Sequence, residues 1–185
     1  MRELMLVALP GIPEVARGAN LAELLSTAVK RAGKTLASGD VLVVAQKIVS
    51  KAEGRSVRLS EVTPSARALE LARTVEKDPC LVELMLRESS EVLRARPGVL
   101  IVQHRLGFVM ASAGVDQSNV PGAPGEETAL LLPEDPDASA RRISAGLRDA
   151  CGAEVGVVVN DSFGRAWRNG VAGTAIGVAG IPALV

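Results

Sequence analysis

A chain of 185 residues with 48% hydrophobic residues is long enough to bury a sizeable core and is not a disordered chain. Its 21 basic and 21 acidic residues give a net charge of zero, so no global electrostatic field favours nucleic acid or anionic lipid, and any anion is expected to bind locally. With 2% aromatic residues, platforms that stack nucleic-acid bases are not expected. Two distant cysteines and the lack of any run near the ~20 apolar residues of a membrane span predict a cytoplasmic protein that binds neither nucleic acid nor membrane.

The first elements expected are a strand, a turn, a helix and a second strand. Residues 4–9 form an apolar run typical of a strand, and the Pro-Gly-Ile-Pro stretch at residues 10–13 predicts a rigid turn with exposed backbone. A capping box over residues 20–23 predicts a helix that ends near Gly33. The continuous β-branched run at residues 41–45 is typical of a strand buried on both faces.

The polar segment that follows this strand, residues 46–51, contains Lys47 and Lys51. Two lysines four residues apart beside a buried strand can reach phosphate groups as point charges. A solvated helical turn or an edge strand explains the same residues without a ligand, so both interpretations stay open.

Two helices are expected next, each marked by a capping side chain followed by proline, at residues 63–64 and 78–79. The second helix is expected to continue to residue 96. Its acidic residues, Glu88 among them, are interpreted as part of an exposed, salt-bridged face.

A hairpin is predicted from the strand-like runs at residues 99–103 and 108–111. His104 lies in the predicted connection, where a surface position is the expected reading, although its chemistry would allow a base. One histidine and two cysteines do not make a zinc ligand set.

The C-terminal part alternates strand, helix and strand. Residues 129–132 predict a short strand, and Asp135 followed by Pro136 predicts a helix that ends at Gly152. A strand at residues 155–159 then leads into a polar segment, and the final apolar, Gly-rich run ends in mid-pattern, as expected of a truncated chain.

Two polar clusters follow predicted strands, one around Asp116 and one around Asp161. If they converge, their carboxylates supply hard oxygen ligands for Mg²⁺ or Mn²⁺. Neighbouring groups then contribute hydroxyls, amides and phosphate-neutralising charges, namely Ser118, Asn119, Ser162, Arg165, Arg168 and Lys51. A polar turn explains the first cluster from local preferences alone, and neither a Walker sequence nor a G-x-G-x-x-G follows the first strand.

Several long segments, in order and in register, closely resemble one known family: residues 41–55, 113–120, 130–140 and 160–173, with the turn at residues 10–13. This is the coenzyme F420-0:L-glutamate ligase family, also called F420 γ-glutamyl ligase. The resemblance implies a single α+β domain over residues 1–185 with mixed sheets and flanking helices, C-terminally incomplete relative to the family and assembled as a homodimer.

The activity implied by the resemblance is GTP-dependent addition of L-glutamate to coenzyme F420-0 through an acyl phosphate, with Mg²⁺ or Mn²⁺ and a further candidate role for K⁺. Asp116, Asp161 and Ser162 match the metal-binding positions of the family. Positions that contact GTP are matched by Gly11, Ile12, Pro13, Gln46, Lys47, Lys51 and Asn119. No catalytic residue is assigned.

Two other functions stay open beside the ligase. One is a non-catalytic fragment or assembly module that binds nucleotide and metal. The other is a different amide-forming or phosphate-transferring enzyme that keeps the two aspartates but changes the acceptor.

Overall fold

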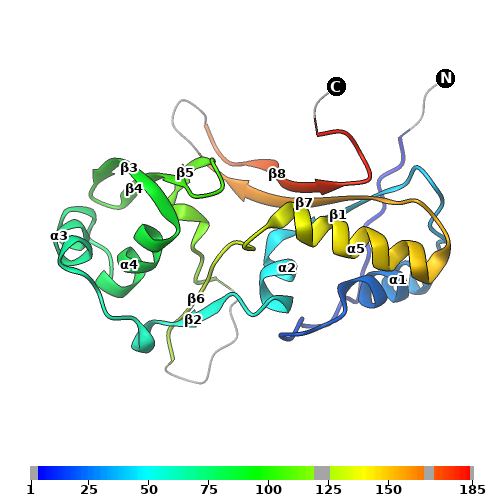
Figure 1. The fold of residues 1–185 in the computed structure, drawn as a ribbon, viewed down its shortest axis with the longest axis horizontal. Helices are drawn as coiled ribbons and strands as arrows, with labels where there is room; N and C mark the ends of the chain where they lie inside the picture. The colour runs from blue at the N-terminus through cyan, green and yellow to red at the C-terminus, as the bar shows by residue number, and fades with distance from the viewer. Residues whose placement is uncertain (1–3, 119–125, 165–168, 184–185) are drawn as a thin grey trace.

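The computed structural model describes residues 4–118, 126–164 and 169–183, and it has the expected mixed α+β architecture. Figure 1 shows its elements in two groups along the long axis of the molecule. Among the described residues the helices are α1 (Leu21–Arg31), α2 (Gln46–Ala52), α3 (Ala66–Val75), α4 (Pro79–Arg87) and α5 (Pro136–Cys151), with 3-10 turns at Leu59–Glu61 and Ser112–Gly114. The strands are β1 (Val41–Ala45), β2 (Ser56–Arg58), β3 (Ser89–Arg96), β4 (Val99–His104), β5 (Val109–Ala111), β6 (Thr128–Leu130), β7 (Gly156–Phe163) and β8 (Ala172–Ala179).

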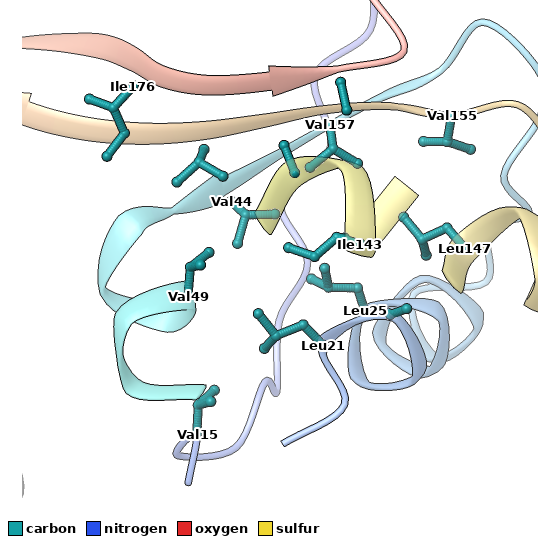
Figure 2. Close-up of a cluster of buried hydrophobic side chains, with 14 of the residues drawn as sticks. Val15, Leu21, Leu25, Val44, Val49, Ile143, Leu147, Val155, Val157 and Ile176 are labelled. Atoms are coloured by element: carbon teal, nitrogen blue, oxygen red, sulfur yellow. The ribbon is translucent and has the colours of Figure 1, made fainter. Parts of the chain in front are cut away.

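The first group is a sheet with helices packed on it. Its strand order is β1-β7-β8, in which β1 runs parallel to β7 and β8 runs antiparallel to it. Apolar side chains from α1, α2 and α5 meet those of the sheet in a shared core, which Figure 2 shows in close-up. This core includes Leu21, Leu25, Val44, Val49, Ile143, Leu147, Val157 and Ile176.

The second group contains the antiparallel sheet β3-β4-β5 and the helices α3 and α4. It has a separate core, which includes Ala68, Val75, Val82, Met85, Leu100 and Val102. The short antiparallel pair β2-β6 lies between the two groups in the view of Figure 1. The chain therefore forms two buried clusters, with the β2-β6 pair between them in this view.

The predicted helix starts are mostly confirmed because capping is local chemistry. Asn20 accepts from the backbone N–H of Glu23 at 3.3 Å, and Asp135 accepts from that of Ala138 at 2.8 Å. Asp78 caps α4 as predicted, but α3 is capped by Ser65 rather than by Thr63. None of the helices in the described ranges is long and apolar enough to cross a membrane.

The strand predicted at residues 4–9 is wrong. The structure has no strand there, and Leu4 and Leu6 are 84% and 87% exposed, so nothing among the described residues covers them. The strand β1 is present, but it lies at the edge of its sheet and Val43 is 65% exposed. The prediction of burial on both faces is therefore also wrong.

The predicted long helix ending at residue 96 is wrong as well. Helix α4 ends at Arg87, and residues 89–96 form β3, which pairs with β4 through an irregular register. Glu88 and His104, both expected at the surface, are buried, His104 completely. The cause is tertiary: folding the β3-β4 pair back onto α4 covers positions whose local sequence is polar.

Candidate functional site

The parallel pair β1-β7 brings two predicted site segments to one edge of a sheet. Ala45 at the end of β1 pairs with Asn160 in β7. Lys47 follows in α2, and Asp161 follows within β7, which extends to Phe163 and so holds residues that were expected in a loop. Carboxyl ends of parallel strands are a common place for ligand sites in α/β sheets, and both side chains occupy that position here.

Asp116 reaches the same edge from the second group. Its backbone N–H donates to Leu130 at 3.0 Å and its carbonyl accepts from Leu130 at 2.7 Å, so it is tied to β6. Its carboxylate contacts the Lys47 ammonium at 2.6 Å. The same ammonium donates to the Ser118 hydroxyl at 2.7 Å. Lys47 and the Asp116 cluster, which are far apart in the sequence, are therefore in contact in the structure.

The Asp116 carboxylate is held ionised by its neighbours. Burial opposes ionisation, but the hydrogen bond from Lys47 and the bonds from the amide and hydroxyl of Ser118 outweigh it, and the pKa of Asp116 is lowered. A negative charge therefore persists at this position near neutral pH.

Asp161 lies close enough to Asp116 for the two charges to interact. Burial raises the pKa of Asp161, and the negative charge of Asp116 raises it further, while the backbone N–H of Ser162 and the charge of Lys47 oppose the change. A cation relieves the repulsion between two carboxylates, and Lys47 supplies one such positive charge here.

The donor set fits a hard divalent cation. Asp116, Asp161 and the hydroxyl of Ser162 offer oxygen ligands, which Mg²⁺ and Mn²⁺ prefer, with waters and phosphates filling the other positions. Within the described ranges, no group of three or more His, Cys, Asp and Glu side chains is placed to hold a metal ion, so any ion here would depend on ligands from outside this side-chain set. The Lys47 ammonium contacts one oxygen of the Asp116 carboxylate.

The remaining positions matched to GTP contacts lie around α2 and the N-terminal turn. Lys51 is only 15% exposed and pairs with Glu14 at 3.6 Å, which links α2 to the segment after residues 11–13. Gln46 is buried and accepts from the Ser50 hydroxyl at 3.0 Å, so its amide helps to fix the helix.

A cavity of about 290 Å³ is lined by Gly11, Ile12 and Pro13 together with residues of α1. A second cavity of the same size lies between α1, α2 and α5, and none of Lys47, Asp116 and Asp161 lines it. The structure therefore brings Lys47 and Asp116 into contact, and the charge of Asp116 acts on Asp161. The segment after the turn at residues 11–13 is linked to α2 through the pair of Glu14 and Lys51. Asn119, Arg165 and Arg168 lie outside the described residues.

The junction between the two cores contains residues to which the sequence analysis assigned no function. Glu88 accepts from Arg55 at 3.0 Å and from Arg105 at 3.1 Å, and His104 lies 3.6 Å away, too far for a hydrogen bond. Nearby, Phe108 packs against Phe163 with ring centroids 6.4 Å apart. The only sequence signal for these residues was that Arg55 lies in a segment that resembles the family.

The fold and these side chains define a mixed α+β protein with polar groups at the carboxyl ends of a parallel strand pair, a common arrangement of a ligand site. The match to a family profile is more specific: the profile of F420-0:gamma-glutamyl ligase covers residues 11–185. The chain belongs to this family.

Three relatives illustrate the similarity, each a coenzyme F420:L-glutamate ligase. The chain is 43% identical to that of Methanothermobacter thermautotrophicus over 95% of its own length and 68% of the relative. It is 45% identical to that of Methanopyrus kandleri over 92% and 64%, and 43% identical to that of Archaeoglobus fulgidus over 94% and 66%. The chain thus spans about two thirds of the length of these relatives.

Proposed function

We propose that this protein is a GTP-dependent ligase of coenzyme F420 biosynthesis, which joins L-glutamate to F420-0 through an amide bond. The observation that carries the proposal is the 2.6 Å contact between the Lys47 ammonium and the Asp116 carboxylate. The influence of the Asp116 charge on Asp161 supports it. The family membership and the names of the relatives support the choice of substrates.

The proposed reaction has two steps. A carboxylate oxygen of F420-0 attacks the γ-phosphorus of GTP, the bond to the leaving GDP breaks, and an acyl phosphate forms. The amine of L-glutamate then attacks the acyl carbon, phosphate leaves, and the amine loses a proton to solvent. Charge develops on phosphate oxygens in the first step, so fixed positive groups near them lower its barrier.

Different residues of this chain would bind the cation and the nucleotide. Asp116, Asp161 and Ser162 would hold Mg²⁺ or Mn²⁺, which supplies charge neutralisation at the phosphates when bound. Lys47 lies beside Asp116 and is placed to turn toward a phosphate oxygen. Lys51 and the turn at residues 11–13 would contact the rest of the nucleotide, with Asn119 as a further contact and K⁺ as a further ion.

A cytoplasmic homodimer is part of the proposal. Large apolar side chains are exposed on the N-terminal segment and on β1, namely Leu4, Met5, Leu6, Val41 and Val43. Exposed apolar side chains gathered on few elements favour a protein partner, and a second copy of this chain is the partner that the resemblance implies.

The test is GDP release by the purified protein with Mn²⁺ or Mg²⁺, F420-0 and L-glutamate, with one component omitted at a time. The proposal predicts release that requires all components and a product heavier by one glutamyl residue. Metal-dependent GTP binding without any release would favour the nucleotide-binding module instead. Release with acceptors other than F420-0 would favour a different amide-forming enzyme.

A further inference from the structure

We propose that Arg55 and Glu88 are positioning residues for the candidate site, because they fix the end of β6, to which Asp116 is hydrogen-bonded, at the place where the Asp116 carboxylate meets Lys47. The inference deepens the proposed function and rests on it, since the pair acts only through the Lys47, Asp116 and Asp161 site. Neither residue would touch substrate or cation.

Arg55 ties the end of α2 to the segment after β6. Its backbone N–H donates to Ser50 at 2.9 Å, and its carbonyl accepts from Leu131 at 3.0 Å. Its side-chain Nε donates to the carbonyl of Leu132 at 2.8 Å. One residue therefore sets the distance between α2, which carries Lys47, and residues 131–132.

Glu88 holds the other end of the Arg55 guanidinium. Both carboxylate oxygens of Glu88 accept from the same Arg55 nitrogen at 3.0 Å, and Arg105 donates to Glu88 at 3.1 Å. The side chains of Arg55 and Glu88 are only 18% and 10% exposed. Since Glu88 follows α4, this contact connects the second core to Arg55. Through Arg55 it also connects the second core to α2 and to residues 131–132.

Residues 130–132 in turn fix the position of Asp116. Leu130 makes two backbone hydrogen bonds with Asp116, at 3.0 and 2.7 Å. Leu132 is completely buried, and a Cβ on Gly114 would lie 2.8 Å from its side chain, so the loop before Asp116 fits closely against it. A shift of residues 130–132 relative to α2 would change the 2.6 Å contact between Asp116 and Lys47.

A buried ion pair adds little stability over an apolar pair of the same size, because desolvation of both charges offsets most of their attraction, although removing one partner alone is costly. What the Arg55–Glu88 pair supplies is geometry: a planar guanidinium fixes its partners in direction as well as distance. Arg55→Lys keeps the charge but has one nitrogen in place of the two fixed nitrogens that donate to the Leu132 carbonyl and to Glu88.

The test uses amine-reactive labelling of the unliganded full chain, read at each lysine by peptide mass spectrometry. Lys47 reacts slowly while its ammonium pairs with Asp116, and Asp116→Asn gives the rate of an unpaired Lys47. Arg55→Met, Arg55→Lys and Glu88→Gln are expected to raise the Lys47 rate roughly two- to fivefold, as for loss of a partly exposed ion pair. Lys51 on the same helix serves as the internal reference.

Arg58→Met is the matched control, since Arg58 lies three residues away and pairs with Glu61 and Glu126 at the surface. It should leave the Lys47 rate unchanged. An unchanged Lys47 rate in Arg55→Lys and Glu88→Gln would overturn the inference. An equal rise in the labelling rate of Lys51 would also overturn it, because that would indicate general opening of α2 rather than displacement of Asp116 from Lys47. If Arg55→Met does not fold, the two milder variants carry the test.

The affinity for Mn²⁺ with GTP, measured on the same proteins, separates the inference from the proposed function. Weaker binding by Arg55→Lys and Glu88→Gln, with wild-type affinity in Arg58→Met, would support the positioning role. Wild-type affinity in both variants would overturn it and leave the proposed function standing. A wild-type protein that binds no Mn²⁺ would overturn the proposed function and, with it, the role of Arg55 and Glu88 in that site.

Discussion

Glu88 is buried between groups that favour its charged form. Burial raises the cost of ionisation, but the contacts of Glu88 with His104, Arg55 and Arg105 outweigh it and lower its pKa from 4.5 to about 2. The folded state therefore binds the Glu88 proton less tightly than the unfolded chain. The stability that Glu88 contributes is fully present above pH 4.5 and is lost as the pH falls from there toward 2.

Acid denaturation measures this contribution. We expect Glu88→Gln to remove about 2 kcal/mol of stability at pH 7 and to flatten the loss of stability between pH 4.5 and pH 2. Urea unfolding at several pH values gives the profile. Glu61→Gln removes an exposed partner of Arg58 and should keep the wild-type slope. Equal acid slopes for wild type and Glu88→Gln would contradict the assignment.

Some residues of the candidate site could be predicted from the sequence, and some of their contacts could not. Asp116 and Asp161 were predictable as a pair because each follows an apolar run with polar neighbours, and Lys47 because it follows β1. The contact between Lys47 and Asp116 was not predictable, since it depends on the pairing of Asp116 with Leu130 across a long connection. The burial of Glu88 and His104 was not predicted for the same reason, because the residues that cover them are distant in the sequence.

Helix α5 and strand β8 meet with no room for a side chain between them. A Cβ on Gly177 would lie 2.4 Å from the backbone of Pro136, at the start of α5, and Asp137 accepts from the Val178 N–H at 2.8 Å. We expect Gly177→Ala to destabilise the protein by about 1–3 kcal/mol, because backbone must shift to admit the methyl group.

Thermal unfolding of matched glycine variants checks this packing. Gly164→Ala is the control, since a Cβ there meets its nearest atom at 3.5 Å, an ordinary contact. It should change stability by less than about 0.5 kcal/mol. Equal effects of the two substitutions would mean that α5 does not pack on β8 as closely as the structure has it.

Elements defined by local chemistry were predicted best. The helices α1, α4 and α5 begin where a capping side chain precedes them, and β1 and β4 lie in apolar runs. Strand β3 was missed because its residues continue the polar and apolar spacing of α4 without a turn residue between them. The strand expected at residues 4–9 has an apolar sequence but no partner among the described residues.

At the scale of the whole molecule, the exposed apolar side chains of β1 bear on assembly. If a second copy covers this face, a charge at Val43 would have to be buried without a partner, which is costly. We expect wild-type protein to sediment as a dimer and Val43→Glu to sediment as a monomer at the same concentration.

Leu93→Glu provides the comparison, because Leu93 is 46% exposed on β3 in the other group of elements. This variant should remain dimeric. A dimeric Val43→Glu protein would mean that the interface lies elsewhere. A monomeric wild-type protein would contradict the proposed homodimer.

We propose that Asp116 and Asp161 form one site for a divalent cation bound with GTP. Calorimetric titration of Mn²⁺ and GTP into wild type, Asp116→Asn and Asp161→Asn tests it most directly, with Glu61→Gln as a surface control and circular dichroism to check folding. We predict that either aspartate substitution abolishes metal-dependent GTP binding, while the control binds as the wild type does. Wild-type affinity for Mn²⁺ and GTP in both folded aspartate variants would contradict the site, and the proposed ligase reaction would lose its structural basis.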